Sequence, residues 1–103
     1  AWLERLEIVK QTFGRTESRI RDLPLRPSDY VRRQIRVTPY PTEDVGALIA
    51  RCGPELFMFS SDYPHVEGGR NPLKRFEESL AERTDAERTA FYAGNFVGLM
   101  GLP

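Results

Sequence analysis

The stretch Leu56-Phe57-Met58-Phe59-Ser60-Ser61-Asp62-Tyr63-Pro64-His65 decides how the rest of the chain is interpreted. Its apolar first half changes abruptly to an acid, an aromatic ring, a proline and the one histidine of the chain. A short apolar run that follows Pro54 and precedes a Gly-rich segment predicts a buried strand at Leu56–Ser60. An acidic residue directly after such a strand holds the position at which α/β enzymes present a catalytic group.

Asp62 has two interpretations at this point. It is either a functional carboxylate at the carboxyl end of a strand or a turn residue whose side chain accepts hydrogen bonds from backbone amides of the loop. Both interpretations fit the spacing of the residues.

The segments around this strand alternate between strand-like and helix-like patterns. Ile35–Thr38 predicts a second short strand, ended by Pro39 and Pro41. Between the two strands, the sequence predicts a helix that Thr42 caps and Gly53 ends, with the apolar face Val45, Leu48, Ile49 and Cys52. Strands that alternate with helices of about ten residues are typical of an α/β protein with a parallel sheet.

The N-terminal part predicts one amphipathic helix and a shorter one. Apolar residues spaced four, three and four apart predict a helix that ends at Gly14 and packs its apolar face into a core: Trp2, Leu6, Val9 and Phe13. Residues 14–27 are polar and irregular. Ser28 is a suitable N-cap for a short helical turn that runs to Gln34.

The C-terminal part predicts two further helices after a flexible loop at residues 66–70. Asn71 and Pro72 are a favoured cap and first position, and the inner stripe of that helix is Leu73, Phe76 and Leu80. Thr84-Asp85-Ala86-Glu87 is a capping box, which starts a last helix that ends at Gly101. Asn95 lies within the apolar face of this helix, so we expect it to bind a neighbouring loop through hydrogen bonds.

Composition excludes several classes of protein. The 103 residues contain 15 basic and 15 acidic side chains, and this balance argues against a dedicated binder of nucleic acid or anionic membranes. A single cysteine rules out an internal disulfide and fits a reducing compartment, so we expect a cytoplasmic protein. No apolar run approaches the roughly 20 residues that a membrane span needs.

Four stretches, in order along the chain, resemble the amidohydrolase family. Ser61-Asp62-Tyr63-Pro64-His65, followed by Glu67-Gly68, is similar to the motif of the last barrel strand in the branch of aminocarboxymuconate semialdehyde decarboxylase-like proteins. The other three stretches resemble the helix after strand six, the segment before strand seven and the closing helix: Ala1–Leu3, Pro27–Gln34 and Gly94–Leu102.

The resemblance implies a metal-dependent (β/α)8 barrel, which needs ~250 residues. Residues 1–103 then correspond to a C-terminal segment of about the last three βα units, helix-rich with two short parallel strands. We expect such a segment to expose apolar surface and to associate with the missing part of the barrel or with another copy of itself.

The resemblance also implies the chemistry. Asp62 corresponds to a residue that binds a divalent metal or shuttles protons at it, with zinc favoured and manganese as the alternative. His65 either contacts substrate, holds Asp62 in place or is a structural loop residue.

The complete enzyme would hydrolyse, or decarboxylate, a small carboxylated or cyclic substrate. Asp62 with at most His65 supplies too few ligands, so we expect no metal on this chain alone. The alternative is a non-catalytic α/β module that acts through protein contacts.

Overall fold

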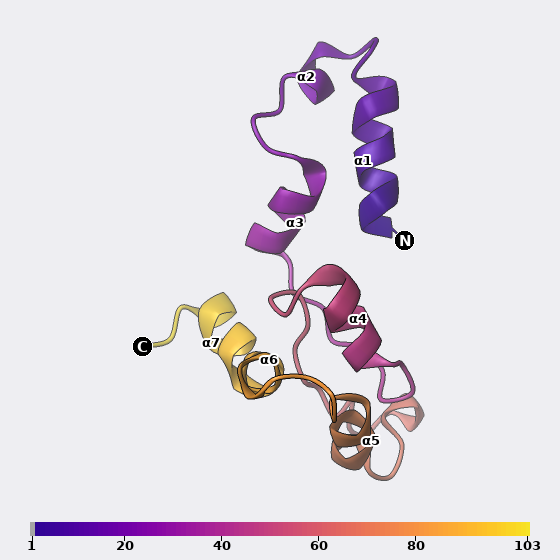
Figure 1. The fold of residues 1–103 in the computed structure, drawn as a ribbon, viewed down its shortest axis with the longest axis vertical. Coiled ribbons are helices and arrows are strands. Elements are labelled where there is room, and N and C mark those ends of the chain that lie inside the picture. Colours follow the sequence, from indigo (N-terminus) through magenta and orange to yellow (C-terminus); the bar gives the residue numbers. More distant parts are fainter. Residues whose placement is uncertain (1) are drawn as a thin grey trace. The chain divides into compact units, whose positions relative to one another are not determined.

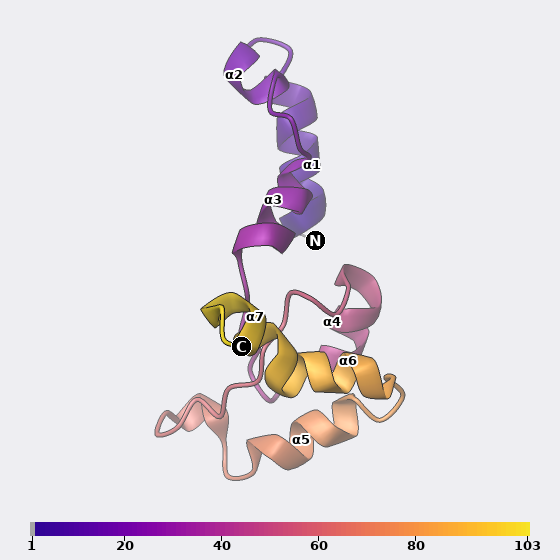
Figure 2. The same cartoon turned by 90° about the vertical axis from the view of Figure 1, so that its left-hand side faces the viewer.

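A computed structural model describes residues 2–103, and the chain divides into two compact units, residues 1–35 and 36–103 (Figures 1 and 2). Ala1, which begins one of the stretches that carry the resemblance, lies outside the described residues. The first unit consists of the helices α1 (Trp2–Phe13), α2 (Ser18–Arg21) and α3 (Pro27–Gln34). The second contains α4 (Val45–Cys52), the 3-10 turn η1 (Val66–Gly68), α5 (Pro72–Ser79), α6 (Asp85–Thr89), the π-helical turn η2 (Ala90–Gly94) and α7 (Asn95–Met100). Within residues 2–103, none of the helices has both the length and the apolar character needed to cross a bilayer.

In the first unit, α2 and α3 lie alongside α1 (Figure 1). Two polar side chains of α1 hold this arrangement. The Lys10 Nζ donates hydrogen bonds to the backbone oxygens of Leu23 and Leu25, both at 3.0 Å. The Glu7 Oε1 accepts a hydrogen bond from the Ser28 N–H at 2.9 Å. Hydrogen bonds from the Ser28 side chain and N–H lower the pKa of Glu7 below its usual range.

The bounds of α1 confirm the predicted helix, but the prediction that its apolar face is buried in a core was wrong. Among the described residues of α1 none is buried, and Phe13 is 55% exposed. Periodicity identifies an apolar face without identifying what covers it.

Two other predictions for this unit also need correction. The predicted irregular segment 14–27 contains α2, where the Glu17 side chain accepts a hydrogen bond from the Arg19 N–H. Helix α3 begins at Pro27, which suits a first helical position, so Ser28 lies inside the helix and not at its cap.

The core of the second unit is built from aliphatic and aromatic side chains of α4, α5, the segment around Phe57 and η2. Its buried members are Val45, Ile49, Leu56, Phe57, Phe76, Leu80 and Phe91. The Phe59 ring packs edge-on against Phe76, with ring centroids 5.7 Å apart, and against Phe91 at 6.3 Å. Leu73, which was predicted to share the inner stripe of α5, is 52% exposed instead.

The two predicted strands, Ile35–Thr38 and Leu56–Ser60, are reduced to a single bridge, and no longer strand occurs among residues 2–103. Val37 and Phe57 form a parallel bridge. The Val37 N–H donates to the Leu56 oxygen at 2.8 Å, and the Met58 N–H donates to the Val37 oxygen at 2.9 Å. The parallel direction was therefore predicted correctly, but the extent of the strands was not.

The C-terminal helices occupy the outer edge of Leu56–Ser60, the edge that points away from Val37. The Asn95 Nδ2 donates to the Pro54 oxygen at 2.6 Å and to the Phe57 oxygen at 2.8 Å, which confirms the predicted tie between this helix and a loop. The Asn95 N–H bonds to the Ala90 oxygen, five residues back, instead of the Phe91 oxygen. The Phe91 oxygen accepts from the Phe59 N–H at 2.9 Å, so the π-helical turn frees a carbonyl for this contact.

In the second unit the helix caps were predicted well, with one exception. Asn71 caps α5, and Thr84 with Glu87 forms the capping box of α6. The cap of α4 is Asp44 rather than Thr42, because the Asp44 Oδ1 accepts from the Ala47 N–H at 3.0 Å. A glycine, Gly53, ends α4 as expected, with a φ of 94°.

Candidate functional site

Asp62 lies in the turn that follows the Val37–Phe57 bridge. Its φ of 55° is in the left-handed region, which Asp tolerates better than most residues. Serine side chains satisfy the backbone of this turn. The Asp62 N–H donates to the Ser60 Oγ at 3.2 Å, and the Tyr63 N–H donates to the Ser61 Oγ at 3.3 Å. Within the described residues, no backbone N–H donates to the Asp62 carboxylate, so the carboxylate does not act as a turn cap here.

The loop after Asp62 folds back onto it, although it was predicted to be flexible. The His65 N–H donates to the Asp62 backbone oxygen at 2.7 Å, and the turn η1 follows. Gly68 is buried at the end of η1, where a Cβ atom would overlap the Ser61 oxygen and lie 3.3 Å from the Asp62 Cβ. Only glycine fits at this position without a shift of the backbone, and this contact fixes the loop against Ser61 and Asp62.

Three ligand-type side chains meet in this loop. The His65 Nδ1 lies 3.4 Å from the Asp62 Oδ1, and Asp62, His65 and Glu67 each offer a ligand atom, all within 4.8 Å of one another. The Asp62 side chain is 31% exposed and the His65 side chain 72%, so the group opens to solvent. Glu67 was not predicted from the sequence as a ligand beside Asp62 and His65. The spacing Asp-x-x-His-x-Glu within one short loop is the signal that indicates it.

The chemistry of this group fits a divalent metal. Zinc binds carboxylate oxygen and imidazole nitrogen at about 2.0–2.2 Å, so two ligand atoms of one ion lie at most about 4.4 Å apart. The ligand atoms of the three side chains lie within 4.8 Å of one another, so small side-chain rotations suffice to bring them to distances that one ion can bridge. Two carboxylates and an imidazole suit zinc or manganese and leave coordination positions open to a substrate.

Comparisons with protein-family models and with curated proteins give no match. Among solved structures, the chain is similar to an amidohydrolase from Mycobacterium avium subsp. paratuberculosis K-10. The TM-score is 0.75, and the sequences are 24% identical over 96% of this chain. The chain therefore shares its fold with part of an amidohydrolase.

This amidohydrolase is much longer than the present chain, which spans 25% of its length. The likeness confirms the amidohydrolase-type fold at a coarse level and agrees with a partial barrel. Three finer points stay predictions: that the chain belongs to the branch of decarboxylase-like proteins, that it is the C-terminal part of a barrel sequence, and that Asp62 and His65 have the roles given above.

Proposed function

We propose that this chain is part of a metal-dependent hydrolase of the amidohydrolase type, acting on a small carboxylated or cyclic substrate. The observation that supports the proposal is the group Asp62, His65 and Glu67 after the bridge-forming segment, the place at which barrel enzymes hold their chemistry. The similarity in fold to an amidohydrolase supports the type of enzyme. In this proposal residues 1–103 are the C-terminal segment of the barrel.

Asp62 is the central residue of the proposed site. It either ligates the metal or accepts a proton during the reaction, and the carboxylate is available for both roles because no backbone amide occupies it. His65 holds Asp62 through the 3.4 Å contact between Nδ1 and Oδ1, or contacts the substrate. A divalent ion, zinc or else manganese, supplies a Lewis acid that polarises a substrate carbonyl and lowers the pKa of bound water toward ~7.

Two alternatives remain beside hydrolysis. A decarboxylase on the same barrel would use the same group of residues. A non-catalytic interaction module is favoured by a different observation, the apolar exposed surface of α7 and the residues after it. Its members are Phe96, Val97, Leu99, Met100 and Leu102, each at least 37% exposed. In the barrel interpretation, the rest of the barrel or another copy of the chain covers this surface.

Asp62→Asn tests the proposed role of the carboxylate. In a protein that contains the complete barrel, we expect turnover to fall at least ~100-fold, since an amide cannot accept a proton. The melting temperature should stay close to wild type because the side chain caps no backbone group. The measurement is steady-state kinetics on small carboxylated and cyclic amides beside thermal melting. Asp85→Asn, at the exposed start of α6, is the matched control. Turnover equal in the two variants would refute the catalytic role of Asp62.

On the 103-residue chain alone, we expect no tightly held zinc after dialysis. The group offers three ligands where closed zinc sites use four, and His65 and Glu67 are both exposed. Metal analysis of the dialysed chain checks this expectation. One zinc per chain that is lost in Asp62→Asn, but kept in the control Glu82→Gln, would show that the loop is a sufficient site by itself.

A further inference from the structure

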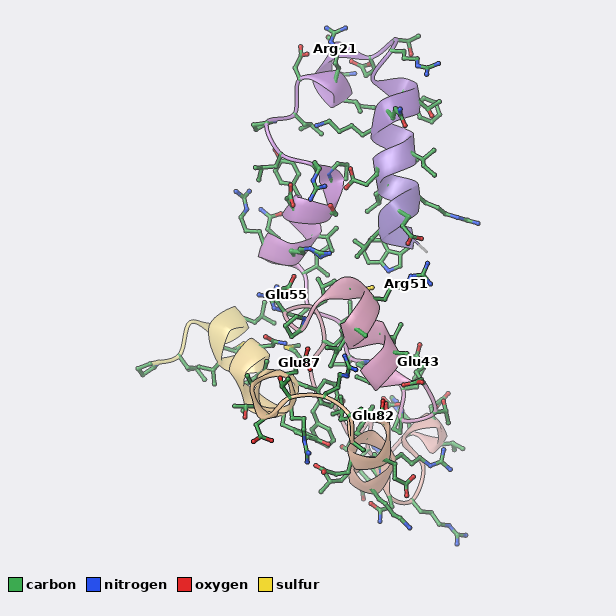
Figure 3. The ribbon with its side chains drawn as sticks, viewed as in Figure 1. Arg21, Glu43, Arg51, Glu55, Glu82 and Glu87 are labelled. Atoms are coloured by element: carbon green, nitrogen blue, oxygen red, sulfur yellow. The ribbon has the colours of Figure 1, made fainter. Side chains whose placement is uncertain are left out.

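A second candidate site lies in the first unit, in a cavity between α1 and the chain that runs through α2 toward α3. Its volume is about 580 Å³, within the range of small-molecule sites. Arg21, which projects from α2 in Figure 3, contributes to its lining. The other lining residues are Glu7, Lys10, Gln11, Gly14, Arg15 and Arg26.

The lining of this cavity is cationic in a chain whose net charge is zero. Four of the lining residues are basic, and Glu7 is the one acidic residue among them. This carboxylate is directed to Ser28, whose N–H donates to it at 2.9 Å. Glu7 is therefore engaged with the backbone of α3 and does not pair with the ammonium of Lys10.

Two of the cations lack a carboxylate partner within the described residues. Lys10 binds only the backbone oxygens of Leu23 and Leu25, which fix the ammonium but leave its charge in place. The Arg15 side chain makes no hydrogen bond or ion pair with residues 2–103. Two positive charges at one cavity, one of them half-buried and already oriented, favour a dianion over a monoanion.

The remaining two cations are paired with acids outside the lining. Arg21 pairs with Asp22 at 3.0 Å, and Arg26 pairs with Asp29 at 3.3 Å. Because these ion pairs are exposed, each holds its guanidinium group only weakly and leaves it available to a ligand. Gly14 lies buried at the cavity, where a Cβ atom would be 2.6 Å from the Lys10 oxygen and 3.3 Å from the Arg21 Cα. The backbone at Gly14, directly after α1, therefore packs closely against the end of α2.

We propose that this cavity binds a small organic phosphate monoester. The phosphate, which carries a charge of about −1.5 to −2 at pH 7, contacts Lys10 and Arg15. Guanidinium groups match the geometry of a phosphate, so Arg21 and Arg26 can contribute further hydrogen bonds. The aliphatic stems of the basic side chains contact the organic part. This site is separate from the group around Asp62 in composition and in ligand chemistry, and it does not depend on the proposed hydrolase.

Phenyl phosphate is the probe that tests this proposal on the 103-residue chain. We expect amide resonances of residues 7–26 to shift on titration, with an affinity that falls as ionic strength rises. Benzyl alcohol, the neutral counterpart, should leave these resonances unchanged, and benzoate should bind more weakly than phenyl phosphate. Shifts of equal size with benzyl alcohol would overturn an anion site. Tighter binding of benzoate would overturn the assignment to phosphate.

Two variants locate the site. Arg15→Gln should weaken binding at least about threefold, because an exposed charge contact is lost while the fold is unaffected. Lys10→Met keeps the aliphatic stem and should weaken binding at least about tenfold, with folding checked by circular dichroism. Arg75→Gln, an exposed position on α5, is the control that should bind as wild type. An Arg15→Gln variant with wild-type affinity would refute the proposal whether or not Lys10→Met folds.

Discussion

Asn95→Asp is expected to lower the free energy of unfolding by about 3 kcal/mol. The Asn95 Nδ2 donates to the Pro54 and Phe57 oxygens at 2.6 and 2.8 Å, and no other donor for these two contacts is observed among residues 2–103. An ionised carboxylate of the same shape has no donor, so it leaves two part-buried acceptors unsatisfied at about 1–3 kcal/mol each. It also places negative charge against two carbonyl oxygens. Urea unfolding at pH 7 measures the change.

Asn71→Asp is the matched control for this experiment. Asn71 caps α5 with its side-chain oxygen, which accepts from the Lys74 N–H at 3.1 Å. An aspartate accepts this hydrogen bond equally well and suits the helix N-terminus, so we expect a change within about 0.5 kcal/mol. The same substitution thus separates a donor role from an acceptor role. Similar losses at both positions would contradict the contacts of Asn95.

The Asn95→Asp variant should regain stability as pH falls. Burial against two carbonyl oxygens raises the pKa of the introduced carboxyl in the folded state above its unfolded value. A group with a raised folded pKa contributes its stability below the unfolded pKa and loses it as pH rises through the folded pKa. The difference from wild type should therefore shrink in acid.

Gly46→Ala is the second substitution with a large expected effect, a loss of about 3 kcal/mol. The added Cβ would overlap the backbone oxygen of Ser79 and lie 3.2 Å from its carbonyl carbon. The Gly46 N–H also donates to the Ser79 Oγ at 2.9 Å, so α4 and the end of α5 cannot separate without losing this hydrogen bond. Overpacking against backbone typically costs about 1–3 kcal/mol, and the hydrogen bond adds to this loss.

Gly98→Ala is the control for Gly46→Ala. Among residues 2–103, no atom beyond the neighbouring backbone of α7 lies within 4 Å of the position that a Cβ of residue 98 would occupy. Alanine there should raise stability by about 0.5–1 kcal/mol, since it restricts the unfolded chain. Thermal melting of both variants measures the contrast. A Gly46→Ala variant as stable as Gly98→Ala would mean that α4 and α5 do not approach as the structure has them.

Asp62 illustrates how much of the candidate site could be predicted. A buried apolar run followed by an acid places Asp62 after a strand-like segment, and this follows from residues that are neighbours in the sequence. Glu67 joins Asp62 because η1 folds back, and this depends on the contact between Gly68 and the Ser61 oxygen. A flexible loop and a folded one have the same composition, so the sequence did not predict this contact.

Most helix ends could be predicted from local residues, because caps, prolines and glycines act within one turn of the residue that they affect. The capping box at Thr84 and the end of α4 at Gly53 are such cases. Which apolar faces are buried depends on how the helices pack: Phe13 of α1 stays exposed, whereas Phe76 of α5 is fully buried. The tertiary structure also reduced the two predicted strands to the Val37–Phe57 bridge. Burial and strand pairing depend on segments that are far apart in the sequence, and no local pattern specifies the partner.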